Sequence, residues 1–180
     1  MKKLISLITL VMATATIACS KSSSKPGNPG TPQTNVPAAL KGDWMHGDFS
    51  MTEYWSQDPD EYLGNGLEFA FAFTFNADGT YTQYFTSSSV MNGVTIYQQS
   101  VTKGTVEVNE TSKTIITHPT KAHYKRTSNG QVVEERDLEN NEMNDATTYS
   151  YATGVEPNGT GTLYLKLAGT NEPLAFLKKP

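Results

Sequence analysis

The feature that most constrains the fold is a strict alternation of large apolar residues with small or polar ones over residues 67–75 (LEFAFAFTF). Because successive side chains of a β-strand point to opposite faces, this pattern places all the phenylalanines on one face. A helix would scatter them around its axis. Residues 76–79 then have turn chemistry, and residues 80–86 are again rich in strand-forming types. The sequence therefore predicts a β-hairpin here.

The same pattern continues to the last residues of the sequence. Asn92-Gly93 and Asn129-Gly130 are signals for two-residue hairpin turns. Pro119 has no backbone donor, so it is expected to break or bulge the strand that contains it. No amphipathic helix longer than two turns is evident. Further strands are predicted at residues 94–97, 104–108, 113–117, 122–126, 131–138, 147–151, 160–167 and 174–177.

This arrangement of short strands predicts an all-β fold. Consecutive hairpins favour an antiparallel meander of about 8–10 strands. Closing the meander into a barrel removes the exposed edges that would otherwise promote aggregation. A β-sandwich is the alternative.

Charge and cysteine content exclude some classes of protein. The 180 residues include 14 Lys and Arg against 18 Asp and Glu, a formal net charge of −4. Nucleic-acid binding requires clustered positive charge, so no nucleic-acid partner is expected. The one cysteine, Cys19, has no partner for an internal disulfide, so its position after an apolar segment calls for another explanation.

The first 18 residues have the layout of a secretory signal. Lys2 and Lys3 supply a positive start, residues 4–17 are apolar or small, and Ala18 precedes Cys19. This apolar stretch is shorter than the roughly 20 residues that a transmembrane helix needs. We therefore expect a removable signal peptide over residues 1–18.

Residues 16–19 (TIAC) resemble the lipobox of bacterial lipoproteins, although Thr16 stands where that family usually has an aliphatic residue. The resemblance implies cleavage before Cys19 and acylation of this cysteine, which would anchor the protein to a membrane of the cell envelope. Ser20 replaces the Asp that commonly retains such proteins in the inner membrane, which favours the outer membrane. Residues 19–37 then comprise the lipidated cysteine and a flexible tether, because they lack aromatic residues and are rich in Ser, Gly and Pro.

Two motifs in the remaining domain, residues 38–180, resemble lipocalins and related lipocalin-like domains of envelope lipoproteins. These are Gly42-Asp43-Trp44 and residues 73–81 (FTFNADGTY). The resemblance implies a lipocalin-like (calycin) barrel in which Trp44 closes one end beneath a basic residue. Lys166, Lys178 and Lys179 all compete for that position. It also implies a central cavity for a small ligand.

The aromatic residues are the best candidates for binding. If the barrel is wide enough, the phenylalanine stripe would line its cavity, and aromatic residues flanking the segment 56–66 would lie at its mouth. The predicted ligand is small and apolar or amphipathic. The candidate ligand-binding residues are Phe69, Phe71, Phe73, Tyr81 and Phe85 inside, with Trp55 and Tyr62 at the mouth.

No catalytic, metal-binding or cofactor-binding residues are predicted. His46, His118 and His123 lack an obvious third metal ligand, and no Gly-x-Ser-x-Gly nucleophile motif occurs. An enzyme would require two facing carboxylates of unlike environment, which sequence spacing does not reveal. The alternative to ligand binding is a non-enzymatic module that docks on another envelope protein or a glycan.

Overall fold

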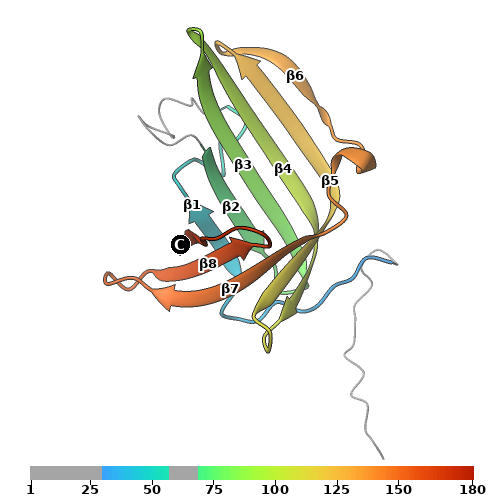
Figure 1. Cartoon of the computed structure of the whole chain (residues 1–180), viewed down its shortest axis with the longest axis vertical. Coiled ribbons are helices and arrows are strands. Elements are labelled where there is room, and N and C mark those ends of the chain that lie inside the picture. The colour runs from blue at the N-terminus through green and yellow to red at the C-terminus, as the bar shows by residue number, and fades with distance from the viewer. Residues whose placement is uncertain (1–29, 57–68) are drawn as a thin grey trace, which may run out of the picture.

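The computed structural model describes residues 30–56 and 69–180 (Figure 1). Within these ranges the chain forms nine strands and one short 3-10 helix, so the all-β prediction is confirmed. The elements are β1 (Gly42–His46), β2 (Phe69–Phe75), β3 (Thr80–Met91), β4 (Val94–Asn109), β5 (Thr114–Ser128), β6 (Gln131–Asp137), η1 (Asn140–Glu142), β7 (Thr147–Val155), β8 (Gly161–Leu167) and β9 (Leu174–Lys178).

Hydrogen-bonded strand pairs form a ring. Antiparallel pairing runs from β1 to β5 through consecutive strands, continues with β7, β8 and β9, and returns from β9 to β1. Trp44 of β1 lies opposite Lys178 of β9, where the ring closes. The predicted antiparallel meander is therefore confirmed, and its eight-strand ring is barrel-like rather than divided into the two sheets of a sandwich.

The fourth and fifth strands are longer than predicted. Each of β4 and β5 joins two segments that the sequence suggested as separate strands. Pro119 bulges β5 without ending it: Lys103 lies opposite Lys121, but Gly104 lies opposite Pro119, which leaves one residue unpaired. Glycine at position 104 is required sterically, because a Cβ there would lie 1.9 Å from the His118 carbonyl oxygen.

Beyond this bulge the sheet forks. Residues 114–117 of β5 pair with β7, whereas residues 123–128 pair with β6. Strands β3, β4 and β5 thus extend past the ring and, with β6, form an open four-stranded sheet (Figure 1). We call this part, residues 88–97 and 118–137, the open leaf.

The tips of the open leaf have the predicted hairpin turns. Asn92 and Gly93 have φ values of 52° and 77°, and Asn129 and Gly130 have 46° and 77°. Two consecutive residues with positive φ define the primed turn that suits the twist of a hairpin. The Asn129 side chain also links the two tips, because its Oδ1 accepts a hydrogen bond of 2.9 Å from the Thr95 amide.

The main core fills the ring. Phe73, Val106, Ile115 and Leu163 are at most 2% exposed, and they come from four different strands. Residues 32–36 pack beside β4, where Thr34 N–H donates to the Val106 carbonyl at 3.0 Å. This part of the segment assigned to the tether therefore contacts the folded domain. The buried members of the main core are Val36, Leu40, Trp44, Phe73, Phe75, Tyr81, Val106, Ile115, Tyr151, Leu163, Leu165 and Phe176.

A second, smaller core lies on the outer face of the same sheet. Residues 47–56 cover this face, and Phe49 and Tyr54 pack on Ala70 and Ala72, which are fully buried. The Tyr54 hydroxyl accepts a hydrogen bond of 3.0 Å from the Ser100 amide. Burial also raises the pKa of Tyr54. This second core was not predicted, because alanines opposite a phenylalanine stripe do not reveal what covers them.

Candidate ligand-binding face

The phenylalanine stripe of β2 runs from the main core to a more accessible position. Phe73 and Phe75 are 2% exposed, and Tyr81, opposite Phe75 on β3, is equally buried. Phe69, Phe71 and Phe85 are only partly buried. Phe71 lies directly opposite Phe85, so these side chains share the inner face of the sheet, the face that lines the ring.

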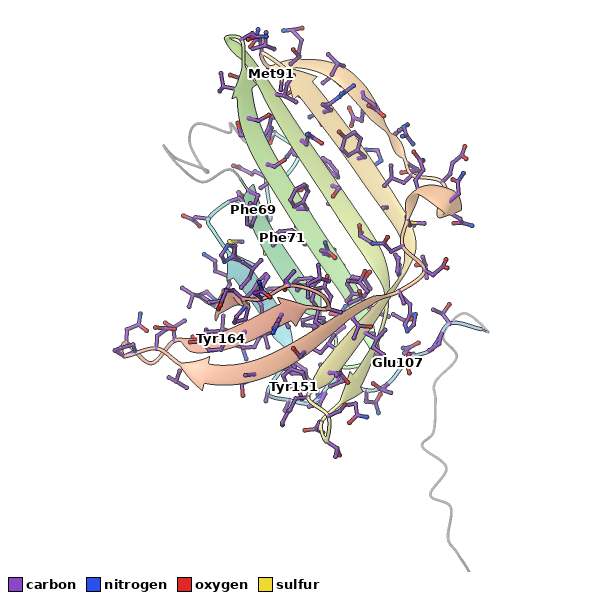
Figure 2. The ribbon with its side chains drawn as sticks, viewed as in Figure 1. Phe69, Phe71, Met91, Glu107, Tyr151 and Tyr164 are labelled. Carbon is purple, nitrogen blue, oxygen red and sulfur yellow. The ribbon has the colours of Figure 1, made fainter. Side chains whose placement is uncertain are left out.

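These partly buried rings form one cluster with His46 of β1. Phe71 contacts Phe85 with ring centroids 4.8 Å apart and Phe69 at 5.5 Å, and the His46 ring stacks on Phe69 at 5.7 Å. His46 also contacts Phe176 of the main core at 5.7 Å. We call Phe69, Phe71, Phe85 and His46 the inner aromatic cluster; Phe69 and Phe71 are labelled in Figure 2. It extends the apolar core toward solvent.

Polar side chains continue this face beyond the cluster. Ser100 of β4 lies opposite Phe85, and Tyr124 of β5 lies opposite Ser100. The Tyr124 hydroxyl donates a hydrogen bond of 2.9 Å to Gln98 Oε1. The inner face thus changes from aromatic to hydrogen-bonding within a few strands, an arrangement suited to an amphipathic molecule.

The other candidate residues do not all join this cluster. Phe73 and Tyr81 lie in the main core, and Trp55 packs against the second core on the outer face. Tyr62, like Cys19, lies outside the described residues. The structure therefore brings together Phe69, Phe71 and Phe85 but separates Trp55 from them by the thickness of the sheet.

Trp44 lies at the end of the ring where the N-terminal segment crosses it. Its indole Nε1–H donates a hydrogen bond of 2.8 Å to the Leu40 carbonyl. Among Lys166, Lys178 and Lys179, it is Lys178 whose Nζ lies over the Trp44 ring, 5.3 Å from its centroid. Such a position allows a cation–π interaction.

The three histidines lie apart and have different partners. His46 Nδ1 donates to the Ala175 carbonyl at 2.9 Å, His118 Nε2 lies 2.7 Å from Glu107, and His123 Nδ1 lies 2.8 Å from Asp137. Among residues 30–56 and 69–180, no group of three or more His, Cys, Asp or Glu side chains converges on a metal position. The same ranges contain no helix long and apolar enough to cross a membrane.

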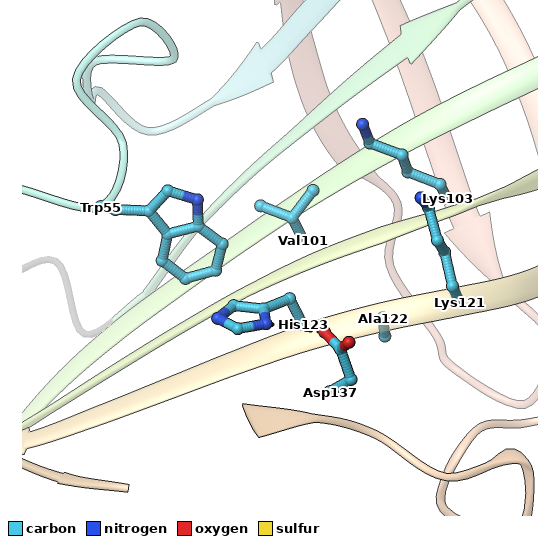
Figure 3. Close-up of a pocket in the computed structure, with 7 residues that line it drawn as sticks. All are labelled: Trp55, Val101, Lys103, Lys121, Ala122, His123 and Asp137. Carbon is cyan, nitrogen blue, oxygen red and sulfur yellow. Dashed lines mark hydrogen bonds and ion pairs between the residues drawn. The ribbon is translucent and has the colours of Figure 1, made fainter. Parts of the chain in front are cut away.

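Trp55 instead forms one wall of a groove of about 390 Å³ on the outer face of β4 and β5 (Figure 3). Nothing in the sequence marked the two lysines that accompany it, Lys103 and Lys121, as part of a site. Lys103 and Lys121 are far apart in the sequence, and only the strand register places them opposite each other. The residues that line the groove are Trp55, Val101, Lys103, Lys121, Ala122, His123 and Asp137.

Comparison with protein-family models and curated proteins does not identify a family for this chain. No protein-family model matches the chain, and no curated protein matches it. The fold defines the class: an all-β protein with an antiparallel, barrel-like sheet.

Proposed function

We propose that this protein is a lipid-anchored component of the bacterial cell envelope. The proposal is supported by the signal-like residues 1–18, by Cys19 after Ile17-Ala18, and by the Ser, Gly and Pro content of the residues that follow. Several acyl chains on one cysteine would hold it stably, because each buried methylene contributes about 0.8 kcal/mol to membrane binding. The outer membrane is the location we favour.

The anchor is tested by Cys19→Ser in the bacterium that makes the protein. We expect the unaltered protein to fractionate with membranes and to carry a mass increase from acylation. The Cys19→Ser chain should lack that mass increase and keep residues 1–18, because in the bacterial lipoproteins that residues 16–19 resemble the signal is cut after the cysteine is acylated. Ser20→Ala is the matched control and should behave like the unaltered protein. Acylation at another residue, or removal of residues 1–18 from the Cys19→Ser chain as in the unaltered protein, would contradict the proposal.

We further propose that the barrel-like domain binds a small apolar or amphipathic ligand on its inner face. The observation that carries this proposal is the inner aromatic cluster: Phe69, Phe71 and Phe85 are partly buried, contact one another, and adjoin the polar pair Gln98 and Tyr124. Burying the exposed part of aromatic rings is favourable at about 25 cal/mol per Å². A ligand with an apolar body would gain this energy.

Native mass spectrometry of the purified full chain is the direct test. A retained adduct of discrete mass is expected, and Phe71→Ala together with Phe85→Ala should remove it. The neutral dye Nile red should report the same loss. Val155→Ala and Leu167→Ala, at exposed apolar positions, form the control pair. If unaltered protein neither retains an adduct nor binds Nile red saturably, the ligand proposal fails, whereas the anchor proposal is unaffected.

An interaction module is the second candidate, and one observation favours it. Val90, Met91, Val132 and Val133 near the tips of the open leaf are 53–71% exposed. Exposed apolar residues gathered at one end often mark a contact with another protein. Cross-linking to an envelope protein through Met91→Cys, but not through the control variant Val155→Cys, would support the interaction module. Equal cross-linking through both variants would contradict it.

A further inference from the structure

We infer that the groove beside Trp55 is a second binding site, for a small molecule that joins an acidic group to an apolar body. The acidic group would lie between Lys103 and Lys121, and the apolar body against Trp55 and Val101. Because this groove is on the outer face, the inference does not depend on ligand binding at the inner aromatic cluster. Figure 3 shows the two lysines at one end, the Trp55 and His123 rings at the other, and Val101 between them.

The backbone pairing of β4 with β5 brings the two lysines together at the cationic end of the groove. Lys103 and Lys121 are directly opposite each other in the β4–β5 pairing, and both are exposed. Like charges opposite each other across a strand pair are unfavourable. Within the described ranges, no carboxylate lies at ion-pair distance from either ammonium group. A bound anion would relieve this repulsion.

The bulge keeps these two lysines in place. The register shift begins immediately after the Lys103–Lys121 pair, where Gly104 meets Pro119. Thr120, in the extra residue position, donates a hydrogen bond of 3.1 Å to the Lys103 carbonyl. Bulges redirect side chains and are frequent beside functional sites. The lysine pair is thus part of a defined backbone feature.

The apolar end is ordered by contacts on several sides. Lys125 Nζ donates a hydrogen bond of 2.7 Å to the Trp55 carbonyl. The Trp55 ring makes edge contacts with Tyr54 and His123, each with a centroid distance of 5.0 Å. Val101, partly buried, packs against the second core. An indole already held in position loses little freedom when an apolar group packs on it.

The acidic groups beside the groove already have a side-chain partner, His123. His123 Nδ1 lies 2.8 Å from Asp137 Oδ1, and His123 Nε2 lies 3.6 Å from Glu135 Oε1. These contacts orient His123 against Trp55 and engage Asp137, the one carboxylate of the groove lining, so that two ammonium groups stand against a single carboxylate there. The groove therefore favours an anion over a cation.

Octanoate and octanol are suitable probes, because they share an apolar chain and differ in charge. The protein is the full chain with Cys19→Ser, which removes acylation. The fluorescence of Trp55 is the readout, and Trp55→Phe identifies its signal against that of buried Trp44. We expect saturable octanoate binding that weakens as ionic strength rises. Lys103→Gln with Lys121→Gln should weaken octanoate binding roughly five- to tenfold but leave octanol binding unchanged.

Lys41→Gln with Lys166→Gln is the control with the same change in net charge, and it should bind octanoate like the unaltered chain. The inference is wrong if octanoate does not saturate, or if the Lys103/Lys121 variant binds it undiminished. It is also wrong if Phe71→Ala alone abolishes binding, since the probe would then occupy the inner aromatic cluster.

A vesicle experiment separates the two sources of such an anion. Phosphatidylglycerol vesicles present the acidic group on a lipid, and phosphatidylcholine vesicles are the comparison. Sedimentation with phosphatidylglycerol that depends on Lys103 and Lys121 would support the site and identify a membrane lipid as the ligand. Octanoate binding without vesicle binding would support the site and identify a free molecule. If octanoate and phosphatidylglycerol vesicles both bind equally well without Lys103 and Lys121, the proposed site is refuted.

Discussion

Gly104→Ala tests the bulge at which β4 and β5 change register. A Cβ at this position would lie 1.9 Å from the His118 carbonyl oxygen and 2.9 Å from Pro119 Cα, where ordinary contacts begin at 3.4 Å. Both obstacles are backbone atoms of the neighbouring strand, so no side-chain rotation relieves the overlap. The two strands would have to separate by about 1.5 Å, the difference between 3.4 and 1.9 Å, which disrupts their hydrogen bonds.

The expected magnitude follows from two opposing effects. Overpacking of this kind costs typically 1–3 kcal/mol. The alanine also reduces the entropy of the unfolded chain, which returns roughly 0.4–1 kcal/mol. The net loss for Gly104→Ala should be roughly 1–2 kcal/mol of unfolding free energy, equivalent to about 2–8 °C in Tm for a domain of this size.

Urea denaturation followed by circular dichroism measures this loss, with Gly161→Ala as the matched control. Gly161 also lies in a strand, but a Cβ there would meet only ordinary contacts of 3.6–3.7 Å with Lys178 and Trp44. Gly161→Ala should therefore be neutral or slightly stabilising. If Gly104→Ala proves as stable as Gly161→Ala, the register of β4 and β5 is not as described, and the placement of Lys103 beside Lys121 fails with it.

Two other predictions concern the ring itself. Trp44→Phe should cost roughly 1–3 kcal/mol of unfolding free energy, because the Leu40 carbonyl loses its indole donor. Lys178→Met, which removes the ammonium group over the Trp44 ring, should cost less. If Trp44→Phe is as stable as the unaltered chain, the hydrogen bond from Trp44 to the Leu40 carbonyl is contradicted. Burial raises the pKa of Tyr149 to about 12 from its ordinary 10.0. The unfolded chain therefore ionises first, so stability present below pH 10 should fall as pH rises toward 12, and Tyr149→Phe should reduce that fall in urea titrations.

The sequence predicts most reliably what neighbouring residues determine. The alternation around Phe71 and Phe73 identified a strand with one apolar face, and the Asn-Gly pairs identified the turns at both tips of the open leaf. These features depend on side-chain alternation and on the positive φ that Asn and Gly accept. Local rules were sufficient for them.

Features that depend on partners distant in the sequence were not predicted. The length of β4 and β5 required knowing that Pro119 would lie opposite Gly104 and be accommodated as a bulge. The burial of Ala70 required knowing that Tyr54 would fold over it, and the groove required the pairing of Lys103 with Lys121. In each case the decisive contact is set by tertiary packing, which one segment of sequence does not contain.

The pairing of β1 with β9 has a consequence for the order of assembly. It joins residues from the two extremes of the folded sequence, whereas every pairing from β1 to β5 links consecutive strands. Contacts between distant residues carry a larger loop-closure entropy and are expected to form late. A newly synthesised chain would therefore form its hairpins first, and its sheet would stay open until β9 pairs with β1. Until then Trp44 and Phe176, which are both buried in the main core of the closed ring, would be exposed to solvent. This is the stage at which the chain is most vulnerable to aggregation and proteolysis.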